Sequence, residues 1–278
     1  MLARLFVFLF LGWMSFTLQG QDLRNLRSKE FGIGIGNFYY LGELNQKHFN
    51  AITPGIHLSY RANINRRIGF NFGFSTGRIE GADSLSDEAF KQNRNLHFRS
   101  SIQEFSVVFE INYFDYQIGN KKYPFSPYLF FGVSAFRFNP KALAPGSQEY
   151  TELQPIGTEG QNLDSGSPYK LFNFAVPFGI GIRLNVVKNL GITVFTGMRR
   201  TYTDYLDDVS TTYANPANFS EEERPFVDRS LDPAGNDGTN TGLQRGDSRN
   251  MDWYNHTGVM ITFKVQKKQN FCPAWYNN

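Results

Sequence analysis

The chain has 278 residues, a formal net charge of +3 and a single cysteine, Cys272. The small net charge and the lack of a dense basic run argue against nucleic acid as a partner, and one cysteine excludes an internal disulfide framework. Aromatic residues make up 16% of the chain and glycine occurs 26 times. This composition favours a transmembrane β-barrel, because only alternate residues of each strand need to be apolar.

Residues 1–20 are predicted to be a secretory signal peptide. Arg4 precedes an apolar run from Leu5 to Leu18, and Gly20 is a small residue at the expected cleavage point. The run is shorter than the roughly 20 apolar residues that a membrane-spanning helix needs. The mature chain is therefore expected to begin at Gln21, with a barrel over residues 21–266 and a periplasmic tail over residues 267–278.

Two-residue periodicity predicts the strands. From Phe172 to Leu184 every even-numbered position is apolar, and the odd-numbered positions are small or polar. Successive side chains of a strand point to opposite faces, so this pattern gives one apolar face and one small or polar face. Eight segments show it, which predicts strands at about 31–41, 52–64, 68–75, 98–114, 127–138, 172–185, 190–199 and 253–265.

The connections between these segments alternate between long and short, so that all long loops lie at one end of the sheet. Outer-membrane barrels show this asymmetry, with short periplasmic turns and long external loops. An even number of strands also lets the sheet close without unpaired edges. We therefore predict a monomeric, eight-stranded, antiparallel up-and-down β-barrel in the outer membrane of a Gram-negative cell, with both termini in the periplasm and a lumen filled by side chains.

Charged residues on the inward face form the main candidate site, a lumen charge network. Charges in a narrow lumen must pair, or they remain buried and uncompensated. Glu110 is predicted to bridge Arg61 and Arg183, and Glu104 and Arg199 are expected higher in the barrel. The predicted network consists of Arg61, Glu104, Glu110, Arg183, Arg199 and Lys264. A structural plug is the favoured interpretation, ahead of a role in transport.

An alternative is a lipid-modifying enzyme that uses His57, Ser59 and His256. Acyl-hydrolase chemistry requires a serine, a histidine base and an acidic residue that orient one another. No acidic residue lies near His57 and Ser59 in the sequence. We therefore predict no enzyme activity, no catalytic residue, no cofactor and no small-molecule substrate.

The carboxylates of Asp204 to Asp208 raise the question of a hard cation. The segment lacks the spaced ligands and the glycine of an EF-hand loop, and it is interpreted as the rim where a strand becomes a loop, without a metal site. Tyrosine and tryptophan residues near strand ends are interpreted as aromatic girdles at the two membrane interfaces. They are Tyr39, Tyr40, Tyr60, Tyr113, Tyr116, Tyr128, Tyr169, Tyr202, Trp253 and Tyr254.

Several stretches resemble the PorG-type family, a component of the type IX secretion system that is associated with gliding motility. The most specific are LQPIGTEGQ, within residues 150–161, and MRRTYTDYLDDVS, residues 198–210. Further similar stretches are GIGNFYYLGELN (34–45), FRSSIQEFSVVFEINYF (98–114), PYLFFGVSAFRFNPKA (127–142) and the segment 177–213.

The resemblance implies a non-enzymatic subunit that anchors or positions a periplasmic ring during protein export. The implied partners are outer-membrane lipid, a PorK-like lipoprotein and a PorN-like protein. Basic residues of the short turns and the tail are candidate contacts, or else simply solvated side chains: Arg66, Arg67, Lys121, Lys122, Lys188, Lys267 and Lys268. The alternative function is a stand-alone surface barrel that uses its long loops for adhesion or ligand contact.

Overall fold

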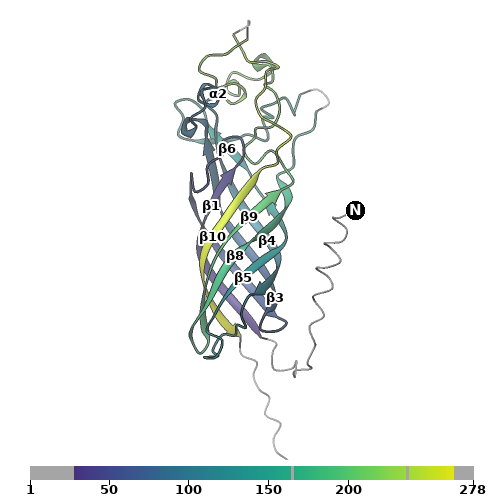
Figure 1. Ribbon diagram of the computed structural model, residues 1–278. Coiled ribbons are helices and arrows are strands. Elements are labelled where there is room, and N and C mark those ends of the chain that lie inside the picture. Colours follow the sequence, from purple (N-terminus) through teal and green to yellow (C-terminus); the bar gives the residue numbers. More distant parts are fainter. Residues whose placement is uncertain (1–27, 164–165, 236–237, 266–278) are drawn as a thin grey trace, which may run out of the picture.

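The protein is a closed antiparallel β-barrel of eight strands (Figure 1). The computed structural model describes residues 28–163, 166–235 and 238–265. Each barrel strand pairs with the barrel strands before and after it in the chain, and β1 pairs with β10 to close the cylinder. The barrel strands are β1 (Lys29–Leu41), β2 (Thr53–Asn63), β3 (Ile68–Ala82), β4 (His97–Asn112), β5 (Phe125–Arg137), β8 (Phe172–Val187), β9 (Leu190–Thr201) and β10 (Trp253–Val265). The predicted fold class is confirmed; the predicted signal peptide and the tail, with Cys272, lie outside the described residues.

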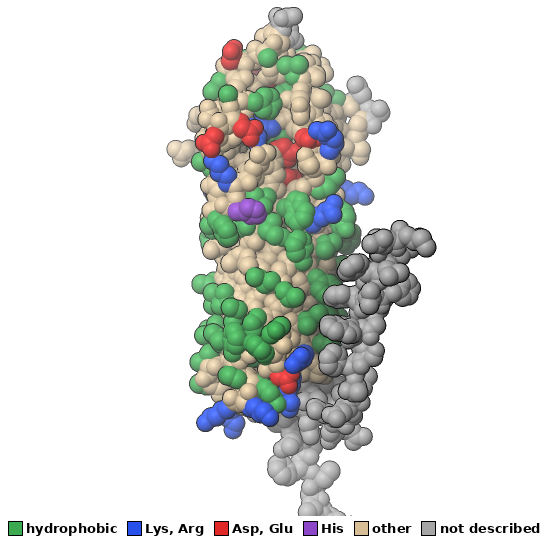
Figure 2. All heavy atoms as spheres, viewed as in Figure 1, with side chains coloured by type: hydrophobic (Ala, Val, Ile, Leu, Met, Phe, Trp, Pro, Cys, Tyr) green, Lys and Arg blue, Asp and Glu red, His purple; other side chains and the backbone are tan. Residues whose placement is uncertain are grey.

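The outer surface carries the apolar face that the periodicity predicts. Four outward residues of β8 are exposed: Phe174, Phe178, Ile180 and Ile182. Arg183, which follows Ile182 and points to the opposite face, is buried in the lumen. Figure 2 shows acidic and basic side chains near the two ends of the barrel, separated by apolar and uncharged surface on the visible face. We call the exposed apolar side chains of the barrel strands, such as Phe174, Phe178, Ile180 and Ile182 of β8, the outer belt. A closed ladder with an apolar exterior satisfies the backbone internally and leaves no polar edge.

The lumen is packed with side chains. Val108, Tyr128, Phe130 and Phe195 form one apolar cluster in the barrel. Gly179 and Gly197 are paired across β8 and β9, and a Cβ atom on either residue would lie only 2.6 or 2.5 Å from Cζ of Phe130. These glycines are therefore required for the close approach of the Phe130 ring to the barrel wall.

Two strand boundaries differ from the sequence prediction. The third strand was expected to end near Ser75, but β3 continues to Ala82, which pairs with His97. Its inward residue Ile79 is fully buried and extends the apolar core toward the long loops. The turn between β8 and β9 is also shorter than expected, because β8 reaches Val187 through a register shift between Asn185 and Val187.

The long loops fold into a cap over one end of the barrel, which we call the loop cap. It comprises residues 42–52, 83–96, 138–171 and 202–252 as far as they are described. Its regular elements are η1 (Asp83–Leu85), α2 (Ala89–Arg94), β6 (Pro140–Leu143), β7 (Tyr150–Glu152), η2 (Pro216–Asn218) and α3 (Arg224–Val227). A hydrophobic core of its own holds it together, made of Ala142, Leu153, Ile156, Phe219, Phe226 and Val227. No helix among the described residues is long and apolar enough to cross a membrane.

The predicted aromatic girdles are only partly correct. Tyr60, Tyr113 and Tyr202 are exposed on the outer surface, as a girdle requires. Tyr39, Tyr40, Tyr116, Tyr128 and Tyr254 are instead buried. Tyrosine is amphipathic, so its position near a strand end fits either an interface or a lumen in which the hydroxyl group finds a partner; the second arrangement holds for Tyr40 and Tyr254.

Candidate functional site

A buried ion cluster occupies the barrel near its short-turn end. The Oε2 atom of Glu110 lies 2.5 Å from Nε of Arg61 and 2.7 Å from Nη2 of Arg183. This is the bridge that the sequence predicts. Glu30 joins the cluster through Arg61, at 3.4 Å. We call Glu30, Arg61, Glu110 and Arg183 the lower lumen cluster.

Neutral groups complete the hydrogen bonding of this cluster. The Asn71 amide donates to Oε1 of Glu110 at 3.0 Å, and the Asn63 amide donates to Oε1 of Glu30 at 2.7 Å. The guanidinium of Arg183 donates to Asn112 at 2.5 Å and lies 3.6 Å from the centre of the Tyr128 ring. Removal of one member of such a buried ion cluster is expected to destabilise the fold, because it leaves another buried charge without its partner.

A second ion pair lies higher in the lumen. Nε of Arg199 is 3.1 Å from Oε2 of Glu104, and the Tyr254 hydroxyl donates to the same oxygen at 2.5 Å. Arg199 also donates to the carbonyl of Gly197 at 2.9 Å. Five members of the predicted network therefore occur as two buried groups. Their role as a structural plug stays a prediction.

Lys264 is the member that does not join. Its Nζ atom donates to the Ile118 carbonyl at 3.4 Å, and it forms no ion pair within the described part of the chain. Lys264 pairs with Glu30 at the very end of the barrel, but its side chain extends to the 113–124 turn.

The lumen leaves almost no free space between the two ion groups. A cavity of about 30 Å³ is lined by His57, Asn71, Glu110 and Arg199, among others, which is room for on the order of one or two waters. Among the described residues, side chains therefore fill the lumen around this cavity.

The residues of the alternative enzyme do not form a triad. The Ser59 hydroxyl contacts the sulfur of Met260 at 3.0 Å, and the rings of His57 and His256 pack 5.2 Å apart. Both histidines are buried in the lumen, away from the outer belt. Among the contacts of the described residues, no carboxylate accepts a hydrogen bond from either ring.

At the other end of the barrel, the loop around Glu159 binds the rim that follows β9. Glu159 accepts hydrogen bonds from the Ser210 backbone at 2.8 Å and from the Thr211 backbone at 3.0 Å, and it pairs with Arg245 at 3.0 Å. Thr158 donates to Asp208. The two stretches LQPIGTEGQ and MRRTYTDYLDDVS, far apart in sequence, thus form one buried unit, which we call the rim unit.

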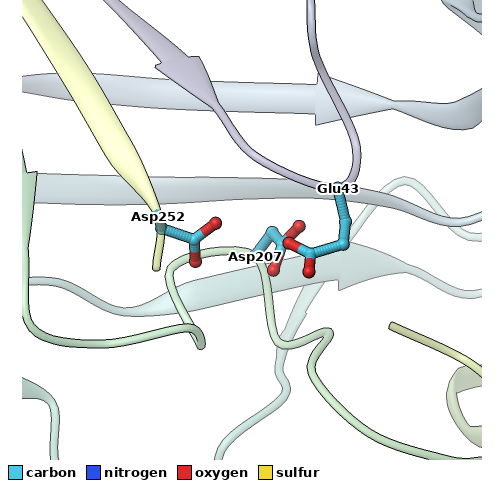
Figure 3. A group of neighbouring side chains, drawn as sticks. All are labelled: Glu43, Asp207 and Asp252. Atoms are coloured by element: carbon cyan, nitrogen blue, oxygen red, sulfur yellow. The ribbon is translucent and has the colours of Figure 1, made fainter. Parts of the chain in front are cut away.

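Carboxylates gather beside the rim unit. Ligand-type oxygens of Glu43, Asp207 and Asp252 lie within 4.8 Å of one another, and Figure 3 shows the three side chains converging from three separate segments. Burial raises the pKa of Glu43 to about 7, and the charge of Asp204 adds to the effect. Burial likewise raises the pKa of Asp204 to about 8, although the nearby Ser210 hydroxyl acts in the opposite direction. Burial, followed by the neighbouring carboxylates, holds the pKa of Asp207 and Asp252 well above the ordinary range.

The short-turn end of the barrel is basic. Arg67, Lys121, Lys122 and Lys188 are exposed there. Asp115 is the carboxylate of this end that solvent reaches, and Arg66 and Arg67 both pair with it, at 3.9 and 2.9 Å. The candidate contacts Lys267 and Lys268 lie outside the described residues.

Sequence reasoning missed Glu30, Glu43, Glu159 and Asp252. Glu30 could have been found from the alternation of β1, because Glu30, Gly32 and Gly34 lie on the same inward face of the strand. Glu43, Glu159 and Asp252 lie in connections, where no periodicity indicates which side chains meet.

Comparison with known proteins identifies a family. A family model described as "Domain of unknown function (DUF6089)" matches residues 3–223. No curated protein matches the chain.

Several solved outer-membrane proteins align with the chain at low identity. Ail, the attachment invasion locus protein of Yersinia pestis, is 10% identical, with coverage of 86% of this chain and 99% of that chain and a TM-score of 0.41. Neisserial surface protein A is 11% identical, with 86% and 97% coverage and a TM-score of 0.37. OprG from Pseudomonas aeruginosa is 7% identical, with 87% and 95% coverage and a TM-score of 0.35. The fold of the present chain rests on its own strand register.

Proposed function

The chain belongs to the DUF6089 family, and from this premise we propose that it is an outer-membrane barrel that serves as a structural subunit of the type IX secretion system. The resemblance to PorG-type proteins motivates the second half of this proposal. The subunit anchors or positions the periplasmic ring, and it has no enzymatic step of its own.

Support for the membrane location comes from the outer belt. Outward residues of β1 and β8 such as Ile35 and Ile180 are exposed and apolar. In water such a surface is an aggregation liability, whereas in a bilayer it faces acyl chains. The long-loop end then lies outside the cell and the short-turn end, where β1 begins and β10 ends, lies in the periplasm.

The observation that carries the secretion proposal is the rim unit. The two stretches that most specifically resemble PorG-type proteins contact each other through Glu159 and Ser210 and through Thr158 and Asp208. The resemblance therefore concerns one buried three-dimensional unit and not two isolated stretches.

The filled lumen favours anchoring over conduction. The lower lumen cluster and the Glu104–Arg199 pair block the barrel interior, so exported proteins do not pass through this chain. Its contribution to export is then made by its surfaces.

The basic short-turn end is the surface that we assign to the ring. Lys121, Lys122 and Lys188 project from two neighbouring turns, and an acidic patch on a PorK-like lipoprotein or a PorN-like protein would complement them. Complementary charge accelerates association and fixes the orientation of a partner.

Recovery of the intact protein from membranes tests this assignment. After mild cross-linking and detergent extraction, the wild-type chain is expected to bring down the ring lipoprotein and its partner. The Lys121→Glu/Lys122→Glu variant places negative charge against the partner, so recovery is expected to fall by about tenfold or more.

The matched control is Lys47→Glu/Lys170→Glu, which reverses two exposed charges in the loop cap and is expected to leave recovery unchanged. Wild-type protein that is recovered alone would contradict the proposal. Such a result would favour the stand-alone surface barrel, for which the observation in favour is the folded loop cap with its own hydrophobic core.

A further inference from the structure

Four carboxylates meet where three neighbouring strands end beneath the loop cap. Glu43 follows β1, Asp204 and Asp207 follow β9, and Asp252 directly precedes β10. Asp207 and Asp252 are fully buried and Asp204 is 6% exposed. We call these four residues the rim carboxylates.

Hydrogen bonding within the protein does not satisfy this group. The Tyr40 hydroxyl lies 2.6 Å from Asp207 and 2.7 Å from Asp252, but a tyrosine carries a single proton and can donate to only one of them. The remaining donors are backbone amides, from Leu206 to Asp252 at 2.9 Å, from Val209 to Asp207 at 3.0 Å and from Asp247 to Oε1 of Glu43 at 3.2 Å.

Two side chains have oxygens with no partner at all. Both carboxylate oxygens of Asp204 are buried without a hydrogen bond, and so is Oε2 of Glu43. Asp204 lies near enough for its charge to raise the pKa of both Glu43 and Asp252. A buried carboxylate without a donor is expensive unless a positive charge neutralises it.

No basic side chain in the described ranges forms an ion pair with the rim carboxylates. The nearest candidate is Arg94, whose guanidinium is already held by Asp83 at 2.8 and 2.7 Å and by the Arg245 carbonyl at 2.5 Å. Within the described residues, this leaves protonation or a bound cation to neutralise the group.

We propose that the rim carboxylates bind one divalent cation of the calcium type. Hard cations prefer carboxylate oxygens, and Ca²⁺ accepts irregular arrangements at about 2.4 Å. Oxygens of Glu43, Asp207 and Asp252 lie within 4.8 Å of one another, so that a small movement of these side chains brings all three into contact with a single ion. Asp204, which has both oxygens free of hydrogen bonds, lies outside this set of three and adds negative charge beside it.

A cation can reach the rim carboxylates from solvent, and they lie where an ion would join three segments of the chain. Glu43 is only partly buried and lines an open crevice with Gln46 and Asp247 on the loop side, through which a cation can enter. A bound ion ties the loop after β1, the rim after β9 and the start of β10 to one point, and so stiffens the attachment of the loop cap to the barrel.

Calorimetric titration tests the proposal directly. Purified full-length protein in detergent is washed with EDTA, dialysed, and titrated with CaCl2. We expect one Ca²⁺ per chain with a Kd of about 10⁻³ M or tighter, the range of extracellular calcium modules. Amide exchange in residues 202–211 is expected to slow when Ca²⁺ is present.

Two variants distinguish the site from general surface binding. Glu43→Gln and Asp204→Asn keep side-chain shape and remove charge, and each is expected to weaken Ca²⁺ binding by about tenfold or more. Asp87→Asn, an exposed loop-cap carboxylate, is the matched control and is expected to bind like the wild type. Absence of binding at about 10 mM Ca²⁺, or unchanged binding by both site variants, would overturn the proposal.

Discussion

Replacement of Glu110 by alanine is expected to lower the free energy of unfolding of the barrel by about 3–5 kcal/mol. The substitution leaves the guanidinium groups of Arg61 and Arg183 in the lumen without their shared carboxylate. It also removes the acceptor of the Asn71 amide. Water can enter the space that the carboxylate leaves, but it brings no negative charge, so the guanidinium charges remain uncompensated.

Urea unfolding of the protein in lipid vesicles measures this effect. The matched control is Glu80→Ala, because Glu80 pairs with Arg99 in a partly exposed position, with each side chain 36% exposed; its loss is expected to cost about 0–1 kcal/mol. A Glu110→Ala protein as stable as the Glu80→Ala protein would show that the lower lumen cluster contributes no net stability.

Replacement of Glu159 by alanine is expected to detach the rim unit while the barrel stays folded. Glu159 is buried and accepts hydrogen bonds from Ser210, from the backbone and hydroxyl of Thr211, and from Arg245. Without it, Arg245 is buried with only Asp208 at 3.8 Å as an ionic partner. The expected local cost is about 3–5 kcal/mol.

Hydrogen exchange separates this local effect from global unfolding. Amides of residues 206–213 are expected to exchange faster in Glu159→Ala, while those of β8 and β9 keep their protection. Glu149→Ala removes an exposed carboxylate from the same loop cap and is expected to change stability by less than about 0.5 kcal/mol. Equal protection of residues 206–213 in the two variants would contradict the account of the rim unit.

The barrel strands could be predicted because a strand in lipid must alternate. Phe178, Ile180 and Ile182 of β8 face outward as expected, and the same parity placed Glu110 between Arg61 and Arg183. Alternation specifies the face on which each strand residue lies. Antiparallel pairing of neighbouring strands then specifies its approximate position along the barrel axis.

The loop cap could not be predicted in the same way. The apolar residues of 202–252 do not repeat with the period of a strand or a helix. Their contacts depend on the path that this segment takes over the end of the barrel. Glu43 and Asp252 meet only because β1 and β10 close the cylinder. Tyr254 was expected at the membrane interface, but its hydroxyl donates to Glu104 inside the lumen, a choice that residue type alone does not decide.

Collision of spin labels with oxygen along β8 tests the central claim, which is that the outward face meets lipid. Cys272 is first replaced by serine, and single cysteines are then introduced and labelled at the outward positions 178, 180, 182 and 184 and at the inward positions Ala175 and Pro177, in protein reconstituted in vesicles. The account predicts high oxygen accessibility at 178, 180, 182 and 184 and low accessibility at 175 and 177, because the even positions are exposed on the outer belt whereas Ala175 and Pro177 are buried. Uniform accessibility, or the opposite phase, would contradict a barrel with this register.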